Sequence, residues 1–538
     1  LLNVERRHHS MRRVLNYTWQ RLPPAEQSVL ATLSVFRGGF TRQAAQTLAM
    51  QPSAMQAPAT QASPVAEARK FISLRLLRNL VYKSLLHYSA TRDRYENHEL
   101  LRRFAADKLA QDANYEMAVR QRHSATYCAA LQARQANLKG SQQQVALAEI
   151  EADVENVRVA WRWAVEQGDV PQIASTLEAL FHFYDMRSWF QEGEQVFREA
   201  ALCLAALPPS REQAVTLARL QARAGWFAFH LGQQHESVRL FQESLSQLQQ
   251  QGAEAESVFN LNYLGAVMRH LGEYERADTY LSEALRLARQ YEDRYQASIT
   301  LNVLGQTSSL RGDYESARYY CREGLRLKRA IGDHRGMTYS LSYLGRVARA
   351  LGEYEEAQRL FEESMHISET LGDQRGVAFA LQNLADTAQA LGRHEKAEKL
   401  YHQALAIFRH IGNPLGASIC LIHLAEVATA RSEMAAARRH LREGLQMALE
   451  SGSTPNLLAG LLAMAGFWLR SGHPEHGLAC LAFVQNYPES TLALQKQAQQ
   501  LERQHATMVA APSPGGLDTL PANGNLASFV EEWLLTLS

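Results

Sequence analysis

A repeat of 40 residues dominates the second half of this sequence. The segment LGEYERA at positions 271–277 recurs as RGDYESA, LGEYEEA and LGRHEKA, each copy 40 residues after the previous one. Ser432 is the one break in a glycine register that comprises Gly232, Gly272, Gly312, Gly352, Gly392 and Gly472. Self-similarity at a fixed period indicates structural units that stack on one another and bury a continuous core.

Each unit is predicted to be a pair of helices. Positions 297–310 carry apolar residues at helical spacing, and Gly312 suits the left-handed position that ends a helix. Positions 314–331 form the second helix, after which Gly332 stops the chain and Asp333 can cap the next helix. A Gly or Ala stands seven residues before each register position from 272 to 432. Helices that cross at about 8–10 Å require such small residues where their backbones meet.

The repeat resembles the tetratricopeptide repeat. The residues that match that family's internal spacing are Leu264, Gly265, Gly272, Tyr274, Ala277 and Ala284. The usual period is about 34 residues, and the longer form found here is similar to the repeats of MalT-like bacterial regulators. The resemblance implies a mainly α protein, with an α-solenoid of helix pairs over residues 153–505 whose first repeats are divergent.

The first helix of each pair is expected to line a concave face. Amide side chains there can satisfy the backbone of a bound peptide, so a protein or peptide segment is the predicted ligand and a small molecule the alternative. Arg346 and Arg349 lie one helical turn apart, which predicts an acidic group of the ligand at that point. The residues predicted to face this groove are Trp226, Phe229, Asn262, Arg269, Asn302, Gln306, Ser309, Tyr339, Ser342, Arg346, Arg349, Phe379, Gln382, Asp386, Gln389 and Glu426.

The first 112 residues do not follow the 40-residue repeat. The double proline at positions 23 and 24 separates two predicted helices, a tight turn follows at Gly38, and Thr41 can cap a third helix. Residues 51–68 are predicted to be a low-complexity loop. Positions 71–109 then predict a helix, two strands joined by a turn near Asp93, and a last helix. Helices followed by a two-stranded wing indicate a winged helix, a small α+β domain.

Three stretches carry a closer resemblance: LSVFRGGFT at 33–41, LVYKSLL at 80–86 and YENHELLRRFA at 95–105. They are similar to the winged-helix domain of the signal-transduction NTPases with numerous domains, the STAND class, which includes NB-ARC ATPases and MalT-like regulators. In that class the order is effector, P-loop ATPase, winged helix and repeat sensor. The resemblance implies signal transduction, and a start at Leu1 without methionine suggests a piece of a longer protein.

The resemblance also singles out His98. NB-ARC members carry Met-His-Asp at this strand-to-helix junction, and their His contacts the ADP phosphate. Asn97-His98-Glu99 stands at the matching place and differs at two of the three positions. The resemblance implies a nucleotide-sensing role for His98, since a His at a helix N-terminus can donate to a phosphate. The alternative is that His98 only caps its own turn.

Motifs for chemistry are missing from the sequence. Without G-x-x-x-x-G-K-[ST] we expect no ATPase activity of this chain itself, so ADP or ATP is expected only with an upstream P-loop domain. Neither H-E-x-x-H nor G-x-S-x-G occurs, and no Cys and His stand at ligand spacing. We therefore predict no catalytic residues, no metal site and no enzyme.

Composition limits partner and compartment. The net charge of +1 provides no bulk attraction for nucleic acid. No apolar run reaches the roughly 18 residues that a membrane span needs. The five cysteines are scattered and form no C-x-x-C, which favours a reducing compartment and predicts a cytoplasmic protein.

Four segments are predicted: a winged helix at 1–112, connecting helices at 113–152, the repeat superhelix at 153–505, and a linker with a short helix at 506–538. In the last segment, the C-terminal helix either docks on the open end of the array or frays in solvent. The preferred function is the sensor region of a STAND NTPase, in which the winged helix relays ligand binding to an upstream ATPase domain and oligomerisation on activation is open. One alternative is a DNA-binding regulator, whose recognition helix would carry Arg75 and Arg78. The other is a plain protein–protein adaptor.

Overall fold

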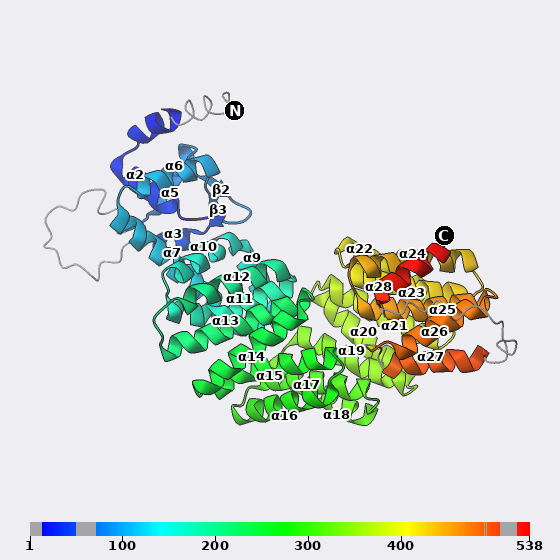
Figure 1. The fold of residues 1–538 in the computed structure, drawn as a ribbon. Coiled ribbons are helices and arrows are strands. Elements are labelled where there is room, and N and C mark those ends of the chain that lie inside the picture. The colour runs from blue at the N-terminus through cyan, green and yellow to red at the C-terminus, as the bar shows by residue number, and fades with distance from the viewer. Residues whose placement is uncertain (1–12, 50–70, 489, 491, 506–524, 538) are drawn as a thin grey trace. The chain divides into compact units, whose positions relative to one another are not determined.

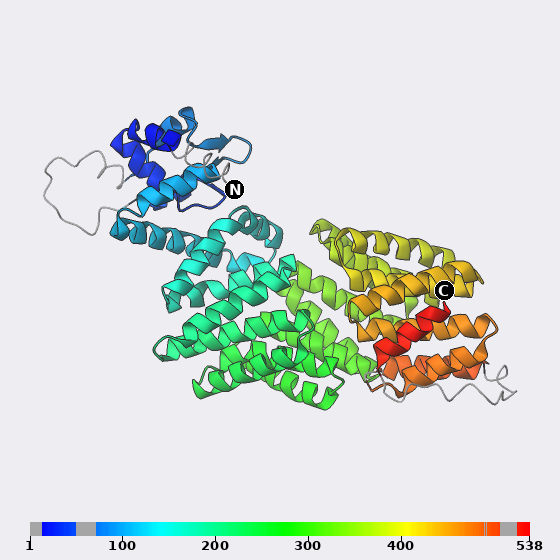
Figure 2. The same ribbon diagram turned by 45° about the horizontal axis from the view of Figure 1, so that its top comes forward.

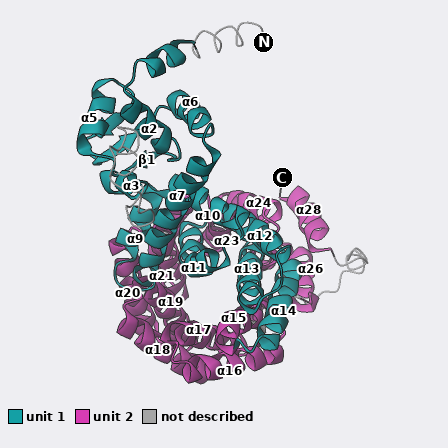
Figure 3. Ribbon diagram, turned by 90° about the vertical axis from the view of Figure 1, so that its left-hand side faces the viewer, with its two compact units in different colours: residues 1–253 teal, residues 254–538 magenta. Residues whose placement is uncertain are grey.

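The computed structural model describes residues 13–49, 71–488, 490, 492–505 and 525–537, most of them in helices (Figure 1). The chain forms two compact units, residues 1–253 and 254–538, called unit 1 and unit 2 below (Figure 3). The predicted loop at 51–68 and nearly all of the predicted linker before position 525 lie outside the described residues. None of the helices in the described part is both long and apolar enough to cross a membrane.

The N-terminal module, residues 13–112, combines helices with a small sheet. Residues 13–20 are helical. The further elements are α2 (Pro24–Leu33), β1 (Gly39–Phe40), α3 (Arg42–Thr47), α5 (Leu74–Tyr82), β2 (His87–Ser89), β3 (Arg94–Glu96) and α6 (Glu99–Leu109). Thr41 accepts a bond from the Ala44 N–H at 3.1 Å, which confirms the predicted cap of α3. This arrangement is consistent with the predicted winged helix.

The sheet has one strand more than predicted. Its order is β1-β3-β2, with both pairs antiparallel, and Tyr95 stands opposite Phe40 on one side and Tyr88 on the other. The predicted tight turn comprises Arg37, Gly38 and Gly39, but Gly39 instead forms the third strand together with Phe40. A strand of two residues is too short to produce any periodicity, so its pairing depends on Tyr95, which is distant in sequence.

Unit 1 continues in helices after the N-terminal module. They are α7 (Ala113–Ala133), α8 (Gln135–Leu138), α9 (Gln143–Ala152), α10 (Val154–Glu166), α11 (Val170–Arg187), α12 (Phe190–Ala205), α13 (Arg211–His230) and α14 (Gln234–Gln250). A break separates α10 from α11, because Gly168 has a φ of +64° and Asp169 caps α11 by accepting from the Gln172 N–H at 3.1 Å. The divergent first repeats therefore use the same stop and start signals as the regular ones.

Unit 2 consists of regular helix pairs and two further helices. The pairs are α15 (Glu254–His270) with α16 (Tyr274–Gln290), α17 (Arg294–Leu310) with α18 (Tyr314–Ile331), α19 (His334–Ala350) with α20 (Tyr354–Thr370), α21 (Gln374–Ala390) with α22 (His394–His410), α23 (Pro414–Ala430) with α24 (Met434–Glu450), and α25 (Thr454–Arg470) with α26 (Pro474–Asn486). α27 (Leu492–His505) and α28 (Leu526–Thr536) follow. Each first helix contacts the next first helix, whereas each second helix from α16 to α24 packs against its own first helix and the following one. The first helices therefore form the inner layer.

The predicted helix boundaries are confirmed. Gly312 has a φ of +82° after α17, and Ser432 adopts the same left-handed conformation at +63°. Asp333, Asp373 and Asn413 accept bonds of 2.8 to 3.0 Å from the N–H groups three residues ahead. These caps satisfy N–H groups that a helix start leaves unpaired.

The small residues inside each pair mark the close contact between its two helices. A Cβ added at Gly265 would lie 2.5 Å from Leu281, and one at Gly345 would lie 2.5 Å from the Phe361 ring. Glycine at these positions is therefore required by packing and not by backbone conformation.

The C-terminal helix α28 docks on the end of unit 2, which decides between the two predicted alternatives (Figure 2). It contacts α24 and α25. Phe529 stacks on Phe483 with ring centroids 4.0 Å apart, and Leu526 and Val530 are buried. The apolar face of α28 therefore covers core residues that the last helix pair would otherwise expose.

The close contact inside a pair can be tested with two Gly→Ala substitutions. Gly345→Ala should lower the free energy of unfolding by about 1–3 kcal/mol, because the new methyl group overpacks against Phe361. Gly466→Ala is the matched control, since its Cβ would meet only Leu501 Cδ2 at 3.9 Å. That variant should gain up to about 1 kcal/mol from helix propensity. Urea denaturation followed by circular dichroism measures both, and equal effects would contradict the packing argument.

Candidate functional site

The first helices of unit 2 present polar residues in columns with the 40-residue spacing. One column holds Gln306, Arg346, Asp386 and Glu426. A second column holds Arg269, Ser309, Arg349 and Gln389. The arginines lie in α15 and α19, and the carboxylates lie in α21 and α23. The charge on this inner face therefore changes from positive to negative along the array.

Arg349 is neutralised within the protein. Its Nη1 lies 2.6 Å from Oδ2 of Asp386, one repeat further along. The prediction that Arg346 and Arg349 together receive an acidic group of a ligand is therefore wrong for Arg349. Helical spacing places both residues on one face of the helix, but it does not show that the next first helix supplies a carboxylate to Arg349.

A polar network extends from this ion pair. The Tyr401 hydroxyl donates to Asp386 Oδ1 at 2.8 Å and lies 2.9 Å from Gln389 Oε1. Gln389 Nε2 donates to Glu426 Oε2 at 3.0 Å, and His423 Nδ1 lies 3.0 Å from the same oxygen. The network joins α19, α21, α22 and α23, so it fixes the acidic half of the inner face.

The charges in this network shift its pKa values. Burial opposes ionisation of Asp386, but Arg349, His423 and the Tyr401 hydroxyl hold the pKa of Asp386 below its usual value. Burial also disfavours protonated His423, yet the hydrogen bond to Glu426 and the charges of Glu426 and Asp386 raise the pKa of His423 above its usual value. Burial and the Asp386 charge together raise the pKa of Tyr401 far above its usual value. The network thus favours a charged His423 between two carboxylates.

Arg269 and Arg346 form the basic half. Arg346 is exposed, and neither residue has an ion pair with a carboxylate among the described residues. The Arg269 Nε is buried and has no hydrogen-bond partner there. Burial lowers the pKa of Arg269, the Arg346 charge lowers it further, and the phenols of Tyr343 and Tyr274 oppose this. A guanidinium that is desolvated without a counter-charge is costly, so this pair would gain from an anionic ligand.

Two predicted groove residues are buried instead. Asn262 and Asn302 are 0% and 6% exposed. Asn262 Oδ1 accepts from Thr300 at 2.6 Å, and Asn302 Oδ1 accepts from Ser340 at 2.8 Å. Their amides link neighbouring first helices, and helical spacing alone cannot separate that position from the open face.

The remaining predicted residues of unit 2 differ in exposure. Tyr339 and Phe379 are exposed at 45% and 37% and stand at equivalent positions of neighbouring repeats. Gln306, Ser309, Ser342 and Gln382 are partly buried. The Ser342 hydroxyl lies 3.2 Å from that of Ser364 in α20, so it turns toward the second helix. The open inner face is thus made of Tyr339, Phe379 and the two free arginines.

The predicted residues of unit 1 pack locally. Trp226 Nε1 donates to Asp185 Oδ1 at 3.2 Å, and the ring lies 6.2 Å from the Phe229 ring. A neighbouring feature that the sequence did not reveal is Glu178, which is surrounded by basic side chains: Lys139, His182, Arg219 and Arg223. Burial raises the pKa of Glu178, but the charges of Arg223, Lys139 and Arg219 outweigh burial and hold this pKa far below its usual value. The irregular spacing of these helices hid this cluster.

His98 lies at the start of α6, as predicted. Its Nδ1 accepts from the Leu100 N–H at 3.4 Å, and its side chain is exposed. This geometry is that of a His that caps its own turn, and it leaves Nε2 available. The nucleotide role of His98 stays a prediction.

One group of described residues has the composition of a metal site. Ligand atoms of His473, Glu475 and His476 all lie within 4.8 Å of one another. His473 already lies 3.7 Å from Glu475, and its ring stacks on that of His476. His476 packs edge-on against Trp468 and Trp533. The prediction that the chain has no metal site stays a prediction.

Comparison with protein families identifies the repeats. Residues 256–330, 334–410 and 377–450 match the model of the tetratricopeptide repeat. This chain carries tetratricopeptide repeats. The predicted resemblance to the tetratricopeptide repeat is therefore confirmed for these residues. A comparison with curated proteins found no match.

Solved structures share the fold. One is a signal transduction ATPase with numerous domains, a STAND protein with a tetratricopeptide repeat sensor from Pyrococcus horikoshii. It has a TM-score of 0.56 and 15% identity, and the match covers 98% of this chain and 67% of that one. Another is a Rap protein complexed with competence and sporulation factor, with a TM-score of 0.52, 14% identity and coverage of 69% and 97%. At these identities the likeness shows the fold.

The ion pair at the centre of the inner face can be tested by removing one partner. Asp386→Ala should lower the free energy of unfolding by roughly 2–3 kcal/mol, because it leaves the Arg349 charge without its partner. The loss stays below that of a fully buried pair, since 25% of the Arg349 side chain is exposed. Urea denaturation measures it. Adding Arg349→Met should recover part of the loss, and no recovery would contradict the pairing.

Stability should also depend on pH through His423. Because the pKa of His423 is raised in the folded state, protonation of this residue stabilises the fold at pH values below its unfolded pKa of about 6.5. This contribution is lost as the pH rises through the pKa of the folded state. The free energy of unfolding of wild type should therefore exceed that of His423→Gln by a larger amount at pH 6 than at pH 9. Urea denaturation at both pH values checks this, with His410→Gln as a control on an exposed His. A difference that does not change with pH would argue against a charged His423.

Proposed function

We propose that this chain is the sensor region of a STAND-type signalling protein, in which the tetratricopeptide repeats bind an acidic protein segment. The N-terminal module would relay this event to a nucleotide-binding domain that precedes it. In this proposal the chain binds and relays in the cytoplasm and is not itself an enzyme. ADP or ATP belongs to the upstream domain, where His98 would contact its phosphate.

The observation that carries the proposal is the uncompensated basic half of the inner face. Arg269 and Arg346 lack carboxylate partners among the described residues, although the next repeat supplies one to Arg349. An acidic side chain or a C-terminal carboxylate could accept bidentate bonds from these guanidinium groups. The exposed rings of Tyr339 and Phe379 add apolar contact area that a peptide can cover.

Two likenesses support the same conclusion. The fold of the STAND protein with a repeat sensor extends over 98% of this chain, including the N-terminal module. The Rap protein of similar fold was crystallised in complex with competence and sporulation factor, so a fold of this kind can hold a ligand. Ligand binding shifts a conformational equilibrium only when the two states bind it unequally. Such a sensor would respond by favouring an open state, which also allows oligomerisation.

The DNA-binding alternative has one supporting observation. Arg75 and Arg78 are exposed on α5, whereas Leu77 and Leu80 of the same helix are buried. Two arginines contribute little to phosphate-driven binding, because its strength grows with the number of neutralised phosphates. We therefore favour the sensor over the DNA-binding regulator, and the plain adaptor differs from the sensor only in lacking a relay.

Peptide selection against the full chain tests the proposal. Peptides selected from a random display library should be enriched in Asp and Glu. The double variant Arg269→Gln with Arg346→Gln should bind the selected peptides at least about tenfold more weakly, since one lost charge-assisted contact already approaches 1.4 kcal/mol. Fluorescence anisotropy with a labelled peptide measures the affinity.

The matched control is Arg276→Gln with Arg286→Gln, which also removes two positive charges, here from the second helix α16, where these arginines pair with Glu273 and Glu283. This variant should bind the peptides as wild type does. Selection of peptides without acidic residues, or equal affinity in the double variant and the control, would refute an anion-binding inner face.

A further inference from the structure

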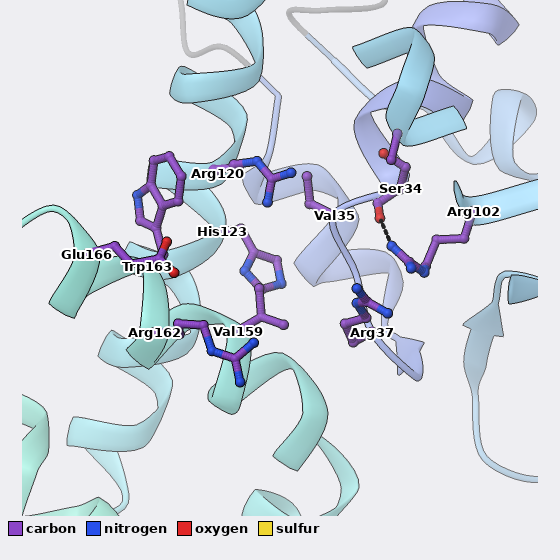
Figure 4. Close-up of a pocket in the computed structure, with 11 residues that line it drawn as sticks. Ser34, Val35, Arg37, Arg102, Arg120, His123, Val159, Arg162, Trp163 and Glu166 are labelled. Carbon is purple, nitrogen blue, oxygen red and sulfur yellow. Dashed lines mark hydrogen bonds between the residues drawn. The ribbon is translucent and has the colours of Figure 1, made fainter. Parts of the chain in front are cut away.

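A cavity in unit 1, apart from the repeat surface, is lined mainly by arginines. It has a volume of about 230 Å³ and lies where the N-terminal module meets α7 and α10 (Figure 4). Its charged lining residues are Arg37, Arg102, Arg120, Arg162 and Glu166. Four cations to one anion is an unusual lining for a chain whose net charge is only +1.

The four guanidinium groups come from four separate segments. Arg37 follows α2, Arg102 lies in α6, Arg120 in α7 and Arg162 in α10. Figure 4 shows Arg37 and Arg102 on one side of the cavity and Arg120 and Arg162 on the other, with Glu166 beside Trp163 at the far end from Arg102. The fold thus brings together four like charges from four different segments.

Two of these arginines are held in place. Arg102 is only 8% exposed, its Nη1 donates to the Ser34 carbonyl at 3.2 Å, and its Nε donates to Glu99 at 2.7 Å. Arg120 Nε donates to Glu116 at 2.9 Å, and its guanidinium lies 5.8 Å from the Trp163 ring centroid. Side chains fixed before binding lose little conformational entropy when a ligand arrives.

The other two arginines have spare hydrogen-bond donors. Arg37 reaches Glu99 only at 3.5 Å. Burial lowers the pKa of Arg37, and the neighbouring Arg102 charge lowers it further. Arg162 has neither a hydrogen bond nor an ion pair in the part of the chain that the structure describes. The cavity therefore combines a positive potential with unsatisfied donors.

Size and charge together define the ligand. Ligand pockets typically measure about 300–1,000 Å³, so this smaller cavity suits an anionic group with a small body. Arginine forks match the oxygens of phosphate, and several of them suit two negative charges better than one. Buried His123 has a pKa of about 4, lowered by burial, so it adds no charge of its own. We propose that this cavity binds the phosphoryl group of a small molecule through Arg37, Arg102, Arg120 and Arg162.

Such a ligand would tie two parts of unit 1 together. Arg37 and Arg102 belong to the N-terminal module, and Arg120 and Arg162 belong to the helices on which the module is docked. A ligand that bridges them stabilises the docked arrangement in proportion to the logarithm of its concentration. This site is independent of the repeat surface, so it adds a second input to the proposed sensor.

Isothermal titration calorimetry of the full chain with inorganic phosphate and with pyrophosphate, at constant ionic strength, tests the site. Wild type should bind at least one of the two. The double variant Arg37→Gln with Arg162→Gln should bind it at least about tenfold more weakly. Neither side chain is buried, so the variant should fold, and an unchanged circular dichroism spectrum confirms this. The ligand should also raise the thermal unfolding midpoint of wild type more than that of the variant.

Arg78→Gln is the matched control, because Arg78 is equally exposed in unit 1 but does not line the cavity. It should bind phosphate or pyrophosphate as wild type does, and so should Arg269→Gln with Arg346→Gln, whose loss concerns only the repeat surface. Equal affinity of the cavity variant and the control would overturn the site. No binding of either probe by wild type, or tighter binding of the dicarboxylate malonate, would overturn its assignment to a phosphoryl group.

Discussion

The repeats depend on one close contact between the two helices of each pair. Gly265, Gly305 and Gly345 leave space that Leu281, Cys321 and Phe361 of the second helix fill. A buried side chain opposite each glycine fills the contact between the two helices in successive pairs. Because neighbouring pairs then stack with the same geometry, residues 40 positions apart take equivalent places, and the first helices display aligned columns on the inner face. The chemistry of that face follows from this regular packing.

Equivalent positions nevertheless carry different chemistry, and this difference gives the inner face its polarity. The column that begins with Gln306 passes through Arg346 to Asp386 and Glu426. Where a cation of one repeat meets an anion of the next, as at Arg349 and Asp386, the charges are satisfied internally and stiffen the array. Where the sequence places only cations, as at Arg269 and Arg346, the protein keeps an unsatisfied charge. A repeat protein can therefore build a binding site by leaving a cation without a counter-ion on a face where the neighbouring cation is paired.

Local signals were predictable from the sequence, whereas pairing across elements was not. Caps such as Asp333, the left-handed glycine positions and the small residues inside each pair depend on neighbours close in sequence, so their pattern determines them. The strand Gly39–Phe40 and the burial of Asn262 depend on partners supplied by another element. Helical spacing identifies the face on which a residue lies, but it does not show what the next helix places opposite. The arginine cavity was missed for the same reason, since its four guanidinium groups are contributed by four segments.

The contact between the N-terminal module and the helices behind it differs in kind from the contacts inside the repeats. Asn156 of α10 accepts from the Arg37 N–H at 2.8 Å and donates to the Gly39 carbonyl at 3.0 Å, while Arg94 pairs with Asp153 at 2.5 Å. Phe36, which packs against His123 and Tyr127, supplies an aromatic anchor. Polar contacts of this kind can be exchanged for water at little net cost, whereas interdigitated core side chains cannot. A relay needs an element with two accessible arrangements, and the polar contact around Asn156 meets that requirement better than the continuous core of the repeats. The arginine cavity adjoins this contact, so an anion bound there would act on the junction between the N-terminal module and the helices α7 and α10.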